Sequence, residues 1–173
     1  MNPLAHDRAS TPDDAHAPFA AVILAGRASG ADRNVVGELV LSARAAGAEA
    51  IVVVVPRGWR APAFSRVVHV APGASTITAI RSGMAQLSNT PARYALLWPL
   101  EAASVDADTL STLVTETMLA RPPFAAMEGD DPDHAPVMIA RDAWLDVMTL
   151  GEQGMAAAAA RRGITRIARM RPT

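Results

Sequence analysis

The chain has 173 residues and a formal net charge of −1, and 50% of its residues are hydrophobic. This composition fits one domain with a buried core, and the charge offers no global attraction to nucleic acid or an anionic membrane. The sequence contains neither cysteine nor lysine. Their absence excludes thiol catalysis, disulfides, Schiff-base chemistry and any phosphate loop that depends on lysine.

Residues 1–18 read as a flexible N-terminal tail, because they contain three prolines and no apolar stretch of the kind that a signal peptide needs. The longest apolar run, Ala50–Pro56, is far shorter than the roughly 20 residues of a membrane-spanning helix. We therefore expect a cytoplasmic protein with no membrane or nucleic-acid partner, and one folded domain at residues 19–173.

The first predicted elements form a strand–helix–strand unit. Ala20–Leu24 and Ile51–Val55 are continuous apolar runs, which are typical of strands buried on both faces. The apolar residues that recur between them at helical spacing are Val36, Leu39, Val40 and Ala43. A helix of this length between two strands indicates a right-handed parallel crossover.

The alternation continues along the rest of the chain. Further strands are predicted at Arg66–Val70, Tyr94–Trp98, Phe124–Met127, Pro136–Ala140 and, at the sheet edge, Ile164–Met170. Ser75 and Asp106 can act as N-caps of two intervening helices. Two terminal helices are predicted around Ala143–Thr149 and Glu152–Arg162. This order predicts a three-layer α/β domain with a mostly parallel sheet.

Ligands bind at the carboxyl ends of strands in such sheets, and two segments there carry suitable chemistry. The small residues of Leu24–Gly30 can form an anion-binding nest or a plain tight loop. Glu101, directly after a central strand, can bind the magnesium ion of a nucleotide or remain a solvated acid. A third group is either a set of hard oxygen ligands or an acidic turn: Glu128, Asp130, Asp131, Asp133 and His134.

Taken together, these segments resemble the MobA-like nucleotidyltransferases, especially the molybdenum-cofactor cytidylyltransferases, from about residue 19 to residue 162. The segments that carry the resemblance are Ala21–Gly26, Ile77–Gly83, Leu96–Glu101, His134–Arg141 and Trp144–Arg162. The resemblance implies a Rossmann-like nucleotide-diphospho-sugar transferase fold. It also implies that a phosphate of a molybdopterin-type acceptor attacks the α-phosphorus of CTP or GTP, with Mg²⁺ present, and that pyrophosphate is released.

The resemblance also implies roles for individual residues. The implied nucleotide-binding residues are Leu24, Ala25, Gly26, Arg27, Ser29 and Gly83. Glu101 and Arg33 would be the catalytic residues, with Glu101 also holding the metal, and His134 would lie on the acceptor side.

The chain departs from the family's motifs where the chemistry takes place. Arg27 stands where the family has a second glycine, Ala31 occupies an arginine position, and Glu101 replaces an aspartate. The phosphate-binding lysine has no counterpart, and electrostatic groups of this kind each contribute about 3–4 kcal/mol to transition-state stabilisation. Two functions therefore stay open: a divergent nucleotidyltransferase, or a catalytically inactive relative that acts as a binding or assembly module for a nucleotide, a pterin-type molecule or a protein partner.

Overall fold

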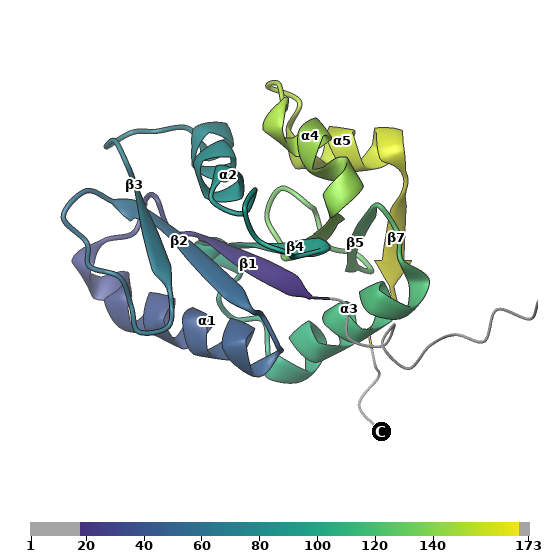
Figure 1. Ribbon diagram of the computed structural model, residues 1–173, viewed down its shortest axis with the longest axis horizontal. Coiled ribbons are helices and arrows are strands. Elements are labelled where there is room, and N and C mark those ends of the chain that lie inside the picture. Colours follow the sequence, from purple (N-terminus) through teal and green to yellow (C-terminus); the bar gives the residue numbers. More distant parts are fainter. Residues whose placement is uncertain (1–17, 170–173) are drawn as a thin grey trace, which may run out of the picture.

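The computed structural model describes residues 18–169, which form a sheet of seven strands between two layers of helices (Figure 1). Residues 1–17 and 170–173 lie outside the described range, and with them almost all of the predicted tail and the end of the last predicted strand. The strands are β1 (Phe19–Leu24), β2 (Ala50–Pro56), β3 (Arg66–Val70), β4 (Tyr94–Pro99), β5 (Phe124–Met127), β6 (Val137–Ala140) and β7 (Ile164–Ile167).

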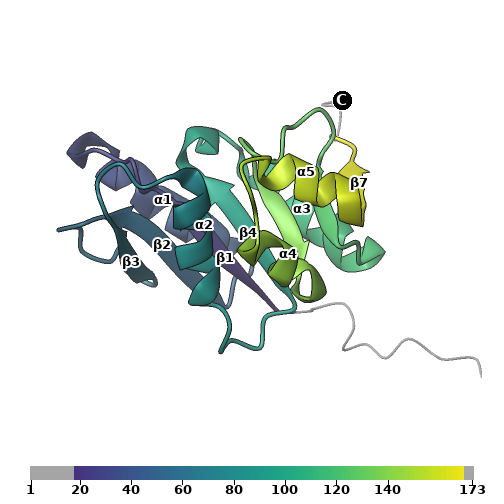
Figure 2. The same cartoon turned by 90° about the horizontal axis from the view of Figure 1, so that it is seen from above.

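The helices cover both faces of this sheet, as the two perpendicular views show (Figures 1 and 2). They are α1 (Arg33–Ala45), α2 (Thr76–Ala85), α3 (Ala107–Ala120), α4 (Trp144–Met148) and α5 (Gly154–Arg162). Helices α1 and α3 pack on one face, and α2, α4 and α5 pack on the other. The three-layer α/β architecture predicted from the sequence is confirmed. Within the described range, no helix is both long and apolar enough to cross a bilayer.

Strand β1 lies at the centre of the sheet because its side chains are apolar on both faces. Its residues are buried from Phe19 to Ile23. Ala21 and Ile23 pack in the core under α1 and α3, whereas Val22 packs in the core under α2. The strand pairs in parallel with both β2 and β4, so Ala21 lies opposite Ile51 on one side and Leu96 on the other.

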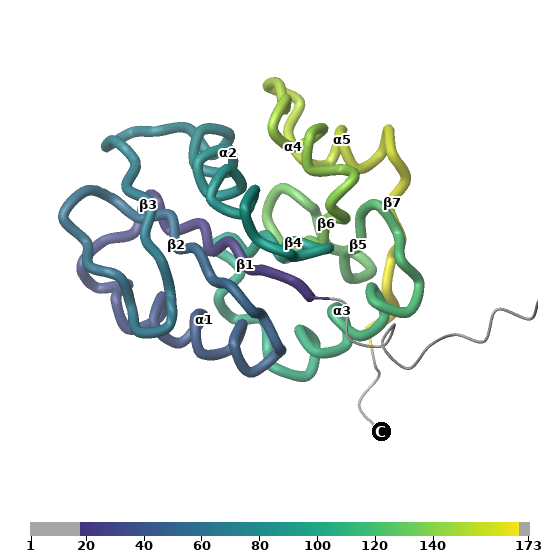
Figure 3. The backbone as a smooth tube through the Cα atoms, viewed as in Figure 1, coloured from purple at the N-terminus to yellow at the C-terminus, as the bar shows by residue number. Residues whose placement is uncertain are grey.

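The strand order across the sheet is β3-β2-β1-β4-β6-β5-β7, and β6 alone in this sheet runs antiparallel to both of its neighbours. The remaining pairs are parallel, as a mostly parallel sheet requires. Strands β5 and β6 therefore form a hairpin, and Figure 3 follows the chain through the loop that joins them. This hairpin loop, residues 128–136, reaches the edge where β1 and β4 also end.

Two helices begin at the N-caps that the sequence predicts. The Ser75 hydroxyl accepts a hydrogen bond from the Thr78 amide at 3.1 Å, and the Asp106 carboxylate accepts one from the Thr109 amide at 2.7 Å. The second bond holds the pKa of Asp106 below its usual value. Helix α3 ends at Arg121, which adopts a positive φ of 51° immediately before two prolines. These local signals fix where α2 and α3 start and so place their first turns beside the carboxyl edge of the sheet.

Candidate functional site

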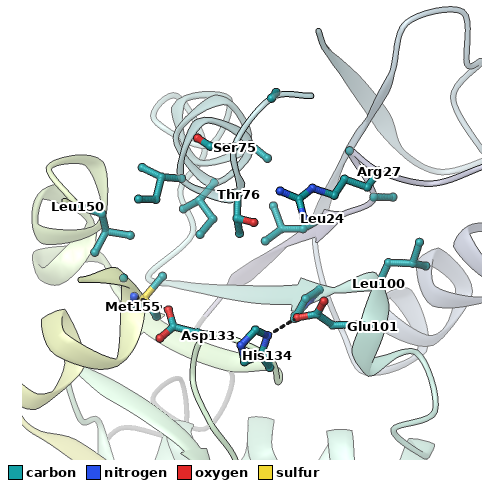
Figure 4. Close-up of a pocket in the computed structure, with 18 of the residues that line it drawn as sticks. Leu24, Arg27, Ser75, Thr76, Leu100, Glu101, Asp133, His134, Leu150 and Met155 are labelled. Carbon is teal, nitrogen blue, oxygen red and sulfur yellow. Dashed lines mark hydrogen bonds and ion pairs between the residues drawn. The ribbon is translucent and has the colours of Figure 1, made fainter. Parts of the chain in front are cut away.

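A cavity of about 740 Å³ opens at the carboxyl edge of the sheet (Figure 4). Its walls are the loop after β1, the turn after β4, the hairpin loop, and the N-terminal ends of α2 and α5. The site residues proposed from the sequence that line it are Leu24, Ala25, Gly26, Arg27, Glu101 and His134. The fold thus brings together residues that lie more than a hundred positions apart in the chain.

Three of the proposed site residues lie outside this cavity lining. The Ser29 amide and hydroxyl both donate to Asp32, at 2.7 and 3.1 Å from the same carboxylate oxygen. The Arg33 guanidinium stacks over the Trp59 ring, 4.9 Å from its centroid. Gly83 lies in the buried face of α2, which packs against β1 and β2. Each of the three contacts a neighbouring part of the fold, and none of them lines the cavity.

The loop after β1 is fixed closely against its neighbours. The Ala25 amide donates to the Val54 carbonyl at 2.8 Å, and a Cβ on Gly26 would lie 3.1 Å from Val70 Cγ2. Between residues 18 and 169, the amides of Gly26 and Arg27 find no hydrogen-bond acceptor. Two successive free amides beside an arginine are a suitable arrangement for an anionic ligand.

Glu101 and His134 form a hydrogen-bonded pair inside the cavity. Nδ1 of His134 lies 2.6 Å from Oε1 of Glu101, and both side chains are more than half exposed (Figure 4). Glu101 comes from the 3-10 turn that follows β4, and His134 comes from the hairpin loop. The hydrogen bond and the charge of Glu101, with smaller contributions from Asp131 and Asp133, raise the pKa of His134.

This pair predicts a measurable pH dependence. Because the pKa of His134 lies above its ordinary value of 6.5 in the folded chain, the pair stabilises the fold fully below pH 6.5. That stabilisation is lost as the pH rises through the raised pKa. We expect Glu101→Gln to move the pKa of His134 down toward the ordinary value in an NMR titration of the imidazole. Glu128→Gln, in the same hairpin loop, should leave it in place, and an unmoved pKa in Glu101→Gln would contradict the pairing.

Asp133 connects the hairpin loop to helix α5. Its Oδ1 accepts a hydrogen bond from the Met155 amide at 2.6 Å, and its Oδ2 lies 3.4 Å from the Ala156 amide. Gly154 has a φ of 76°, and a Cβ there would lie 2.6 Å from Asp133 Oδ1. Glycine is therefore required at this position both by the backbone conformation and by the space that the carboxylate occupies.

Two more acids of the hairpin loop have partners of their own, and one of them, Asp131, accepts a hydrogen bond from the Asp133 amide. Asp130 binds the Arg169 guanidinium through its carboxylate and the Arg166 guanidinium through its carbonyl. The acidic residues therefore pair separately instead of converging on one point. Across residues 18–169, no three histidine or acidic side chains are grouped so that they could hold a metal ion together.

Sequence reasoning missed several residues that complete the cavity, among them Asp32, Thr76, Ile77, Leu150, Glu152 and Met155. The predicted cap at Ser75 was a usable signal for the α2 residues, because a helix that follows a parallel strand starts at the carboxyl edge. No local pattern marks Leu150 or Met155, which reach the cavity through the packing of α4 and α5.

No family model matches the chain, and no curated protein matches its sequence. Solved structures do match its fold. Rv0371c from Mycobacterium tuberculosis H37Rv, in complex with manganese, aligns with a TM-score of 0.67 and 20% identity, covering 87% of this chain and 88% of that one.

Two enzymes give similar alignments. A nucleotidyl transferase from Methanothermobacter thermautotrophicus has a TM-score of 0.59 and 14% identity, with 90% and 88% of the two chains covered. The 2-C-methyl-D-erythritol 4-phosphate cytidylyltransferase from Thermus thermophilus has a TM-score of 0.59 and 14% identity, with 87% of each chain covered. At these identities the likeness concerns architecture. The chain therefore has the Rossmann-like α/β fold that nucleotidyltransferases share.

Proposed function

We propose that this protein binds a nucleoside triphosphate in the cavity and transfers its nucleotidyl group to an acceptor, releasing pyrophosphate. One observation carries the proposal. The loop after β1 and Glu101 after β4 line a single cavity at the carboxyl edge, in a chain with the fold of nucleotidyltransferases. Ligands of open α/β sheets bind at this edge.

The loop after β1 would hold the phosphates. Arg27 is exposed, and its side chain extends toward the cavity from the same wall as Leu24 (Figure 4). Its guanidinium can bind phosphate oxygens in a bidentate manner, and the amides of Gly26 and Arg27 can add two further donors. In-line nucleotidyl transfer depends mainly on such positioning and charge neutralisation.

The residues of the cavity suit a magnesium ion that arrives with the triphosphate. Magnesium is commonly held by one or two carboxylates together with substrate phosphates. Glu101 uses one carboxylate oxygen for His134 and has a second oxygen for the ion, whereas both oxygens of Asp133 face helix α5. Such an ion would neutralise the phosphates beside Glu101. The protein side of this arrangement is a single carboxylate and not a closed metal site.

The charges of the lining make nucleotide binding dependent on this ion. Arg27 contributes one positive charge to the wall, where Asp32 and Glu101 contribute negative ones. A free triphosphate would meet net repulsion, and a magnesium complex would not. The sequence resemblance predicts that the nucleotide is CTP or GTP. It also predicts that the acceptor is the molybdopterin-type phosphate of the MobA-like family.

A thermal-shift comparison of CTP, GTP and ATP, each with and without Mg²⁺, tests nucleotide binding. A ligand at 100 times its Kd stabilises the folded state by about 2.7 kcal/mol. We expect the midpoint to rise with at least one nucleotide, only when Mg²⁺ is present, and Arg27→Ala to abolish the rise. Arg57→Ala, an exposed arginine outside the cavity lining, is the matched control. A midpoint unchanged by all three magnesium complexes would rule the proposal out.

A second candidate is a binding module without turnover. It is favoured by the missing lysine, by the placement of Ser29 and Arg33 against other residues, and by the pairing of Glu101 with His134. This candidate predicts that the magnesium–nucleotide complex, or a pterin-type molecule, binds without release of pyrophosphate. It also allows a protein partner, which an affinity capture with the full chain would test.

A further inference from the structure

We infer that the acceptor is an uncharged molecule with an apolar body and a hydroxyl group, and not a phosphate. The inference rests on the proposed function and names the acceptor class for the same cavity. It departs from the phosphate acceptor that the sequence resemblance implies. Three features of the cavity support it: the charges on the acceptor side, the occupation of the α5 N-terminus, and the geometry of the Glu101–His134 pair.

The acceptor half of the cavity is the wall opposite Leu24 and Arg27 (Figure 4). We define it by the lining residues Asp133, His134, Leu150, Glu152, Gln153 and Met155. No arginine of the described chain belongs to this half. The arginine packed behind it, Arg81, donates to the Leu150 carbonyl and does not reach the lining.

The charges of the acceptor half are unsuited to a phosphate. Asp133 and Glu152 are acidic, and Arg27, the arginine of the cavity lining within residues 18–169, lies on the opposite wall. A dianionic phosphate would face the carboxylates of Asp133 and Glu152, and the basic side chain of this half, the imidazole of His134, is already paired with Glu101. Like charges repel, and water screens the part of this repulsion that comes from the exposed Glu152. An uncharged group avoids this repulsion.

The helix N-terminus that could have bound a phosphate is already occupied. Free amides at the start of a helix form a ready anion site. At α5 these amides belong to Met155 and Ala156, and the Asp133 carboxylate faces both of them. Gly154 leaves the space for that carboxylate. The protein thus supplies its own anion at the point where an acceptor phosphate would be held.

The uncharged residues of this half are the polar Gln153 and the apolar Leu150 and Met155. Leu150 and Met155 line it, and Ile77 and Ile80 of α2 line the adjoining wall. Apolar walls with a few polar groups are typical of sites for small organic molecules. This surface suits the ring or chain of an acceptor whose polar group points toward Glu101 and His134.

The Glu101–His134 pair supplies what a hydroxyl acceptor needs. An alcohol must lose its proton when it attacks, whereas a phosphate oxygen is already ionised at neutral pH. Glu101 engages Nδ1 of His134 and so orients the ring, and Nε2 is left for the acceptor. This arrangement of a carboxylate, an imidazole and a nucleophile is a common form of general-base catalysis.

The step balances with these groups alone. The acceptor oxygen forms a bond to the α-phosphorus of the nucleotide, and the hydroxyl proton passes to Nε2 of His134. The bond between the α-phosphorus and the oxygen that bridges to the β-phosphate breaks. Pyrophosphate leaves with the electron pair of that bond, and no oxidant or reductant takes part.

A matched pair of probes tests the acceptor class. The probes are 2-phenylethanol and 2-phenylethyl phosphate, which share a ring and differ in the reactive group, and their Kd values are measured by NMR on the full chain saturated with Mg²⁺ and nucleotide. We expect the alcohol to bind about tenfold more tightly than the phosphate, a difference of about 1.4 kcal/mol. Glu152→Gln should tighten phosphate binding severalfold, and Glu128→Gln, outside the cavity, should not.

Turnover gives a second readout with the same probes. The alcohol should accelerate pyrophosphate release, and the phosphate should not. Equal or tighter binding of the phosphate, or binding of neither probe, overturns the inference while leaving nucleotide binding intact. Failure of the magnesium–nucleotide complex to bind in the thermal-shift experiment overturns the proposed function and the acceptor assignment together.

Discussion

Replacing Gly83 with alanine is expected to lower the free energy of unfolding by about 3 kcal/mol, at the upper end of what overpacking a core costs. The new Cβ would overlap Val22 Cγ1 and would lie 2.9 Å from Val54 Cγ2. Both separations are shorter than non-bonded carbon atoms normally adopt. Both valines are fully buried in the sheet, so neither can move aside. Chemical denaturation, followed by circular dichroism, measures the change.

Gly37→Ala provides the matched control. Gly37 also lies within a helix, α1, but nothing lies within 4 Å of the Cβ that alanine would add. Alanine in place of an unconstrained helical glycine should stabilise the fold by about 0.5–1 kcal/mol. If the two substitutions changed stability in the same direction, the close packing of Gly83 on β1 and β2 would be disproved. The result also separates a packing role from the nucleotide-binding role that the sequence resemblance implies for Gly83.

Glu101→Ala is expected to reduce the rate of pyrophosphate release from the magnesium–nucleotide complex by about 100-fold, the effect of removing one well-placed electrostatic group. The substitution removes the carboxylate that would contact the metal and also the partner that orients His134. Glu101→Gln keeps a hydrogen-bond acceptor for the imidazole without the charge, so it should retain more activity than alanine if orientation matters.

Glu38→Ala is the control for this experiment, because Glu38 is an exposed acid of α1 outside the cavity. Its rate should equal that of the unsubstituted chain, as measured by a coupled assay for pyrophosphate. Equal rates for Glu101→Ala and Glu38→Ala, at any level above background, would exclude Glu101 from the chemistry. The binding-module candidate predicts instead that no chain releases pyrophosphate above background.

The sequence predicts the scaffold well because its signals are local. Short continuous apolar runs such as Ala20–Leu24 are typical of strands that are buried on both faces of a sheet. Strands β1 and β2 form where these runs occur. The N-caps Ser75 and Asp106 satisfy amides within their own first turns, so no distant contact is needed to place them.

The candidate site is predicted less completely because its residues depend on distant contacts. The resemblance implies a nucleotide-binding role for Ser29 and a catalytic role for Arg33, yet the 3-10 turn at Gly30–Asp32 directs them to Asp32 and Trp59. A glycine that allows a ligand to approach and a glycine that allows a strand to approach look the same in a sequence. Gly83 is of the second kind in this structure, and only the neighbouring valines reveal it.

The direction of β6 was not specified by the predicted strands, although the absence of a helix between β5 and β6 was a signal. Parallel neighbours need a long crossover, whereas antiparallel neighbours can be joined by a short loop. The hairpin is what carries His134 to within 2.6 Å of Glu101.

The same hairpin places two residues of the proposed acceptor half, Asp133 and His134, on a single loop. Strands β5 and β6 are held in register by their own pairing and by β4 and β7, so a replacement loop that keeps the contacts of Asp133 with helix α5 and of Asp130 with Arg166 and Arg169 would preserve the scaffold. A loop of different length and charge at residues 128–136 would change the side chains that this loop places in the cavity. The phosphate-facing loop after β1 would keep its sequence. Variation in this loop would therefore change Asp133 and His134 of the acceptor half, while Leu150, Glu152, Gln153 and Met155 would stay the same.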